Sequence, residues 1–148
     1  MTIVRSGAQF VSVVAVAAAI FISQPGCSKT KKKCIDKQAY TSDLVQMVHL
    51  LVDAQKAGNS GGGGYANAVS QVQSAANLAD STANDLSAVP EVAGEWRVAA
   101  ARLKSAASKL QENGDMEGAK RDIVEATTHF QAAVDQLGEG HFCVTGAQ

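Results

Sequence analysis

Residues 116–137 read MEGAKRDIVEATTHFQAAVDQL, and this stretch decides the fold class. Its apolar residues recur at alternating steps of three and four, which is the spacing of one face of a helix packed against other helices. The residues on this face are Met116, Ala119, Ile123, Ala126, Phe130, Ala133 and Leu137. Ahead of them, Asn113-Gly114 forms a helix stop and Asp115 is a candidate N-cap. The pattern predicts a helix over 116–137.

Three earlier stretches repeat this spacing and predict helices from 36 or 41 to 57, over 65–88 and over 90–112. Pro90 and Glu91 suit the first turn of the third helix, and the glycine-rich residues 58–64 form a connector. No useful stretch alternates with period two, so no strands are expected. The sequence therefore predicts an all-α, up-down antiparallel four-helix bundle over residues 35–148. The alternative is an extended hairpin pair or a coiled-coil dimer.

Residues 1–26 have the anatomy of an export signal. Arg5 is their single charged residue, an apolar run covers 10–22, and Gly26 precedes Cys27. In these features the segment resembles the signal of a bacterial lipoprotein precursor, which implies removal of 1–26 and attachment of a lipid such as palmitate to Cys27. Gln24 and Pro25 depart from the family's usual Leu and Ala or Ser. Cleavage after the alanines 17–19, giving a secreted protein, and an uncut membrane anchor are the two alternatives.

Residues 27–34 form a tether with Lys29, Lys31, Lys32 and Lys33, which either meet anionic headgroups at the membrane surface or act as a hydrophilic spacer. From residue 35 onward, eight Lys and Arg against fourteen Asp and Glu leave a charge of −6. An acidic body disfavours nucleic acid as a partner.

The chain has three cysteines, an odd number for an oxidising compartment. If Cys27 carries lipid, Cys34 and Cys143 remain and are predicted to form a disulfide near the two ends of the mature chain. Two free thiols are the alternative.

A second resemblance rests on Cys34, on Pro90-Glu91 ahead of Trp96, and on Cys143 in the C-terminal tail. In these features the domain resembles the small Ala-rich helical lipoproteins of actinobacterial envelopes. The resemblance implies a helical domain exported and anchored on the extracytoplasmic side of the membrane, and it supplies no activity.

The sequence contains few residues in catalytic or metal-binding patterns. His49–Asp53 and Glu125–His129 are one helical turn apart and are interpreted as ordinary surface pairs, so no metal site is expected. The glycines 61–64 lack the Lys-Ser/Thr of a phosphate loop, and no serine sits in a nucleophile motif. We expect no cofactor and no enzymatic activity.

One feature favours binding. Beside its core stripe, the first helix carries Val45, Val48 and Val52, with Leu50 on the other flank. Together these residues span about 220° of the helix, more than one bundle seam requires. The expected function is a membrane-tethered interaction module whose candidate contacts to an envelope protein are Val45, Leu50 and Val52. The alternative is a carrier or sensor of a small apolar ligand, held in a core cavity beside Trp96 and Phe130. Core packing of both stripes and of Trp96 is the plainer interpretation.

Overall fold

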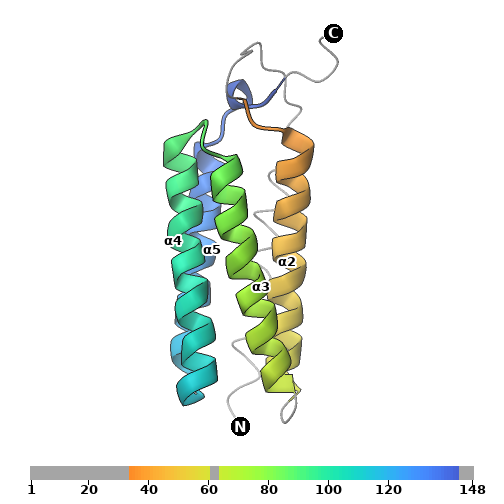
Figure 1. Ribbon diagram of the computed structural model, residues 1–148, viewed down its shortest axis with the longest axis vertical. Coiled ribbons are helices and arrows are strands. Elements are labelled where there is room, and N and C mark those ends of the chain that lie inside the picture. The colour runs from red at the N-terminus through yellow and green to blue at the C-terminus, as the bar shows by residue number, and fades with distance from the viewer. Residues whose placement is uncertain (1–33, 61–63, 144–148) are drawn as a thin grey trace.

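The computed structural model describes residues 34–60 and 64–143. It contains four long α-helices: α2 (Lys37–Asn59), α3 (Gly64–Asp85), α4 (Pro90–Ser108) and α5 (Met116–Gln136). A π-helical turn, η2 (Lys109–Asn113), extends α4, and a 3₁₀ turn, η3 (Glu139–His141), follows α5. The helices pack against one another, and the described residues form no extended strand. The prediction of an all-α bundle is confirmed (Figure 1).

The helix ends follow local chemistry. The Asp36 and Asp115 carboxylates accept hydrogen bonds from the backbone N–H groups of Ala39 at 3.0 Å and Gly118 at 2.9 Å, so both aspartates are N-caps. Gly114 ends η2 with φ of 59°, a left-handed conformation that favours glycine. The stop and the Asp115 cap were both predicted. One predicted end was wrong: α3 ends at Asp85 instead of 88. The third predicted helix, 90–112, corresponds to α4 together with the π-helical turn η2, which ends at Asn113.

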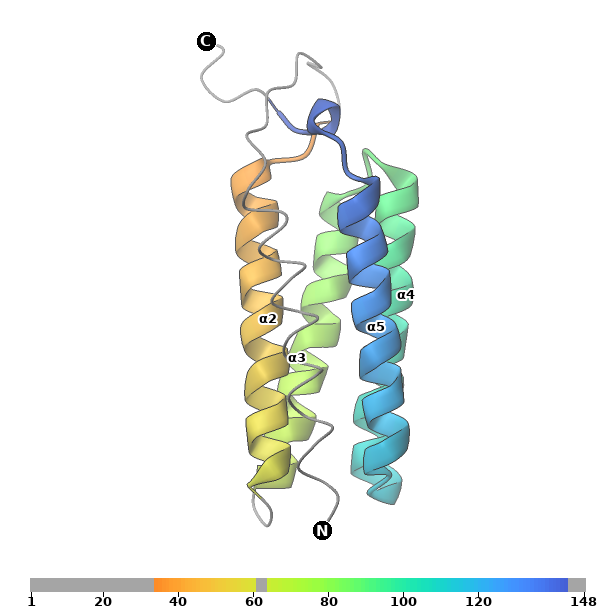
Figure 2. The ribbon, with the colours of Figure 1, turned by 180° about the vertical axis from the view of Figure 1, so that it is seen from behind.

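The bundle is built from consecutive pairs. Along the chain, α2 packs on α3, α3 on α4 and α4 on α5, whereas α2 and α5 do not approach each other closely along their described lengths. In Figures 1 and 2 the coloured chain turns back at each link, and α2 and α5 flank the side seen from behind. We call the boundary between these two helices the α2–α5 seam.

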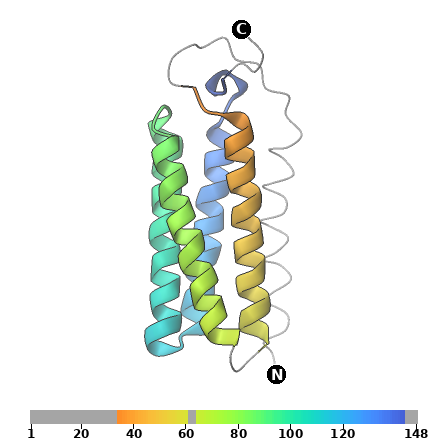
Figure 3. The ribbon, with the colours of Figure 1, turned by 45° about the vertical axis from the view of Figure 1, so that its right-hand side comes forward.

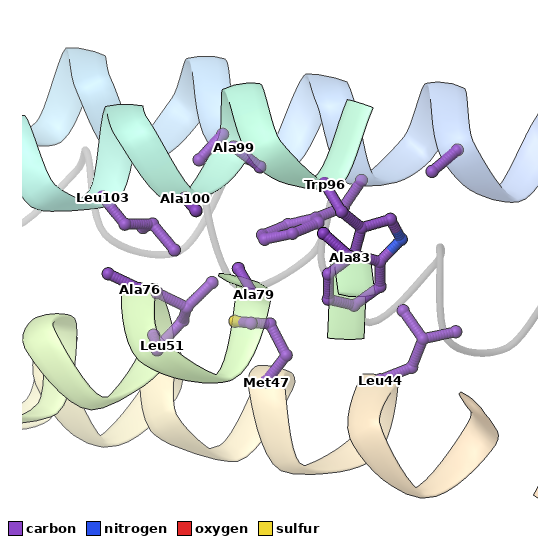
Figure 4. Packing of buried hydrophobic residues seen from close by; sticks show 14 of the residues in the cluster. Leu44, Met47, Leu51, Ala76, Ala79, Ala83, Trp96, Ala99, Ala100 and Leu103 are labelled. Atoms are coloured by element: carbon purple, nitrogen blue, oxygen red, sulfur yellow. The ribbon is translucent and has the colours of Figure 1, made fainter. Parts of the chain in front are cut away.

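The core is a mixture of many alanines and a few large side chains. Alanines contributed by all four helices are buried, as are Met47, Leu51, Leu103 and Trp96 (Figure 4). Small side chains let helix backbones come close together, while the large ones fill the space between the helices.

A short clasp joins the two ends of the described chain. It consists of residues 34–36 and 141–143. Cys34 and Cys143 form a disulfide with a Cα–Cα distance of 4.8 Å, which confirms the predicted pairing. The Ile35 N–H donates to the His141 carbonyl at 2.8 Å, and the Cys143 N–H donates to the Ile35 carbonyl at 2.9 Å. Ile35 and Phe142 are both buried, so the clasp covers the end of the bundle from which α2 starts (Figure 3).

The first prediction concerns this disulfide. It closes a loop with a sequence separation of 109 residues, and removing such a link frees the unfolded chain. We expect the Cys34→Ser/Cys143→Ser double variant to lose about 2–4 kcal/mol of unfolding free energy. Urea denaturation with and without reductant measures the loss. The double variant is its own control, because reductant should not change its stability. A wild type that is equally stable with and without reductant would contradict the prediction.

Candidate functional site

The three candidate contact residues on α2 lie on two different flanks. Asp43 accepts a hydrogen bond from the Thr82 hydroxyl of α3 at 2.9 Å, which marks the flank that faces α3. At 100° per residue Leu50 shares this flank with Asp43, and it packs against the core. Val45 and Val52 lie on the opposite flank, towards the α2–α5 seam. Val45 is 37 % exposed and Val52 is half-buried. Of the three, only Val45 and Val52 form one surface.

Trp96 and Phe130 belong to an aromatic cluster near the clasp. The rings of Trp96 and Phe130 have centroids 4.7 Å apart, and Tyr40 meets Trp96 edge-on at 5.7 Å. The Trp96 indole N–H donates to the Tyr40 hydroxyl oxygen at 3.2 Å. Burial raises the pKa of Tyr40 well above its ordinary value and outweighs the opposing effect of this hydrogen bond, so the hydroxyl stays protonated. Trp96 has no exposed surface (Figure 4) and joins α2, α4 and α5.

An apolar pocket lies at the other end of the bundle, on the α2–α5 seam. It has a volume of about 80 Å³. Its walls come from the C-terminal half of α2, the start of α3, η2 and the N-terminal half of α5, and they include Leu51, Ala54, Val72, Leu110, Met116 and Ile123. Trp96 and Phe130 do not line it. This pocket is therefore not the cavity beside Trp96 and Phe130 that the sequence led us to expect.

Three polar residues, Gln55, Asn59 and Lys120, line the same pocket. The Gln55 side-chain carbonyl oxygen, Oε1, is buried and has no hydrogen-bond partner in the described part of the chain. Lys120 also lines the pocket, and its ammonium group lies 3.6 Å from the Glu117 carboxylate, which is 80 % exposed. An exposed pair of this kind contributes little, so Lys120 is available to a ligand. Sequence spacing does not identify either residue, because both lie outside the core stripes.

The side-chain partner of His129 is not the one that the sequence predicted. The His129 Nδ1 lies 2.5 Å from a Glu95 carboxylate oxygen on α4, while Glu125 pairs with Arg102 at 2.8 Å. The predicted Glu125–His129 surface pair is therefore wrong, because both side chains reach across to α4. His49 is exposed on α2. Within residues 34–60 and 64–143, no three His, Cys, Asp or Glu side chains gather as metal ligands would.

Asp122 on α5 is a buried carboxylate. Its oxygen accepts from the Ser105 hydroxyl at 2.6 Å and pairs with the Lys109 ammonium at 2.8 Å. Burial raises the pKa of Asp122, but hydrogen bonds from Lys109 and Ser105 and the charges of Lys109 and Arg102 lower it below its ordinary value of 3.8. The carboxylate is fixed in its ionised form and holds α5 to α4 and η2.

Several predicted site residues lie outside the described residues. They are Cys27 and Lys29, Lys31, Lys32 and Lys33, together with the signal segment 1–26. Among the helices that the structure describes, none has the length and apolar character needed to cross a bilayer.

The chain was compared with protein-family models, curated proteins and solved structures, and none of the three comparisons found a match.

The second prediction concerns Asp122. A folded-state pKa below the unfolded value means that the ionised group stabilises the fold above pH 3.8, and this contribution is lost as the pH falls through the lowered value. At pH 7 we expect Asp122→Asn to lose about 1–2 kcal/mol of unfolding free energy. The deficit should shrink in strongly acidic buffer. Asp135→Asn, an exposed change on the same helix, is the control and should have little effect. Denaturant titrations at several pH values measure both variants, and a deficit that grows with acidity would refute the assignment.

Proposed function

We propose that this chain is a membrane-tethered, non-enzymatic interaction module of the bacterial cell envelope. Its export signal ends before Cys27, which carries the lipid anchor, and the domain stands on the extracytoplasmic side. Lys29, Lys31, Lys32 and Lys33 lie against anionic headgroups, where each charge contributes about 1 kcal/mol of attraction. Support comes from the signal anatomy, the resemblance to actinobacterial envelope lipoproteins, and the Cys34–Cys143 disulfide, which leaves Cys27 as the one unpaired cysteine.

The observation that carries the interaction proposal is the free flank of α2. This helix packs closely against α3 alone among the described long helices. Its other flank bears the exposed Val45 and the half-buried Val52, seven residues apart and thus about 10 Å along the helix. Two apolar side chains on one exposed stripe are the anchors expected when a protein partner packs on a helix face. The partner in this proposal is another envelope protein.

A second candidate function is the carriage of a small apolar ligand. It is favoured by the apolar pocket on the α2–α5 seam. This candidate uses a different part of the molecule from the Val45 stripe, since neither Val45 nor Val52 lines the pocket.

The third prediction tests the anchor. In bacteria grown with labelled palmitate, the wild-type chain should carry label and sediment with membranes. Cys27→Ala should lose the label and leave the membrane fraction, because no thiol remains for acylation. Ser28→Ala is the matched control and should behave as the wild type. Label and membrane binding that survive in Cys27→Ala would overturn the anchor assignment.

The fourth prediction tests the contact surface. A photo-cross-linking residue at Val45 or at Val52 should yield the same protein adduct in cells, identified by mass spectrometry. The control position is Val98, which is 41 % exposed but lies on α4. Leu50, on the α3 flank, should give less of that adduct. If Val98 gives the same adducts as Val45, or if Val45 gives none, the α2 flank is not the interaction surface.

A further inference from the structure

We propose that the seam pocket binds the alkyl chain of a fatty acid, with the carboxylate at Lys120. This inference deepens the second candidate function and rests on it. The pocket is walled mostly by aliphatic and thioether side chains, and Lys120 is its one cationic lining residue among the described residues. An apolar lining with one cation beside it is complementary to a molecule that has an apolar chain and a single anionic head.

The size and position of the pocket fit a chain better than a compact ligand. Its volume of about 80 Å³ is roughly half that of an engineered apolar cavity that holds benzene. A globular ligand of drug size is therefore too large for it. A single alkyl chain is a narrower shape, and residues of both α2 and α5 line the pocket, so they would contact such a chain from two sides.

Lys120 supplies the charge complementarity. It lies on the first half of α5 beside Met116 and Ile123, and its side chain keeps 27 % of its surface exposed. Its intrahelical neighbour Glu117 is largely solvated, so a carboxylate at the pocket mouth can replace that contact at little expense. The body of the protein is acidic overall, which makes a lysine at the mouth of an apolar pocket the favourable place for an anion.

Gln55 is a second, independent indication of a ligand. Its buried Oε1 borders the pocket and has no hydrogen-bond partner among residues 34–60 and 64–143, and such an atom is costly to leave unpaired. A side-chain amide offers both a donor and an acceptor, and rotating it by half a turn exchanges them. Turned over, Gln55 presents its N–H₂ group to the same carboxylate that Lys120 binds.

The fifth prediction tests this assignment on the purified full-length chain. The probes are hexanoate, octanoate, decanoate and dodecanoate below their micellar concentrations, measured by isothermal titration calorimetry. We expect one binding site per protein molecule. The affinity should rise about fourfold for each added CH₂ until the alkyl chain fills the apolar space. Lys120→Glu should weaken decanoate binding about tenfold, by losing one attraction and adding one repulsion. The control is Arg121→Glu, which makes the same charge change on the next residue of α5. Arg121 does not line the pocket, so the decanoate affinity of this variant should stay within twofold of the wild type.

Two further measurements separate the possible failures. Ala119→Leu fills the pocket wall and should abolish binding, with circular dichroism confirming its helical content; if it does not fold, Lys120→Glu still decides the outcome. Decanol probes the apolar site without a charge. Tight decanol binding together with no effect of Lys120→Glu would overturn the fatty acid assignment while keeping an apolar carrier. Binding of neither probe would overturn both. Both assignments would also be overturned if another part of the protein occupied the pocket. A second copy of the chain would be seen as a dimer in sedimentation, and the chain's own apolar residues 10–22 would be seen as an internal cross-link.

Discussion

The Cys34–Cys143 disulfide is the constraint on which the arrangement of the bundle depends. Because α2 packs closely on α3 but not on α5, the first and last helices lack the continuous contact that joins the other consecutive pairs. The clasp supplies a covalent link between the start of α2 and the segment after α5. Its two backbone hydrogen bonds and the buried Ile35 and Phe142 add packing to that link. The clasp therefore fixes the start of α2 to the end of α5 at one end of the bundle.

Large and small side chains are also distributed differently between the two ends of the bundle. Near the clasp, Trp96 fills the space between helices with its ring against Phe130 and its N–H on Tyr40. Near the other end the corresponding layer holds Ala54, Ala68 and Ala119, with Gly58 beside them. Small side chains on helices that stay apart leave volume unfilled. The pocket lies at the end of the bundle away from Trp96, where small residues stand among the aliphatic side chains of its wall.

The sequence predicted the parts of this structure that depend on one helix at a time. Apolar spacing identified Ala119, Ala126 and Phe130 as core residues, and all three are buried. Local chemistry likewise predicted the cap at Asp115. What it did not predict was contact between helices. The spacing of Glu125 and His129 suggested a pair, yet each side chain pairs with a residue of α4. Likewise, periodicity shows which residues face inward but not how far apart two helices settle, so Gln55 and Lys120 could not be recognised beside a pocket.

The clasp and the pocket stand at opposite ends of the described bundle. Ala54, in the pocket wall, is 17 residues into α2 and so about 25 Å along the helix axis from the start of α2 beside the clasp. If the chain is anchored as proposed, through the residues before Cys34, a fatty acid in the pocket would be held away from the bilayer. The exposed Val45 lies between these two ends. A partner docked on that flank would stand over the seam on which the pocket lies, so partner binding and ligand binding would share one face of the bundle.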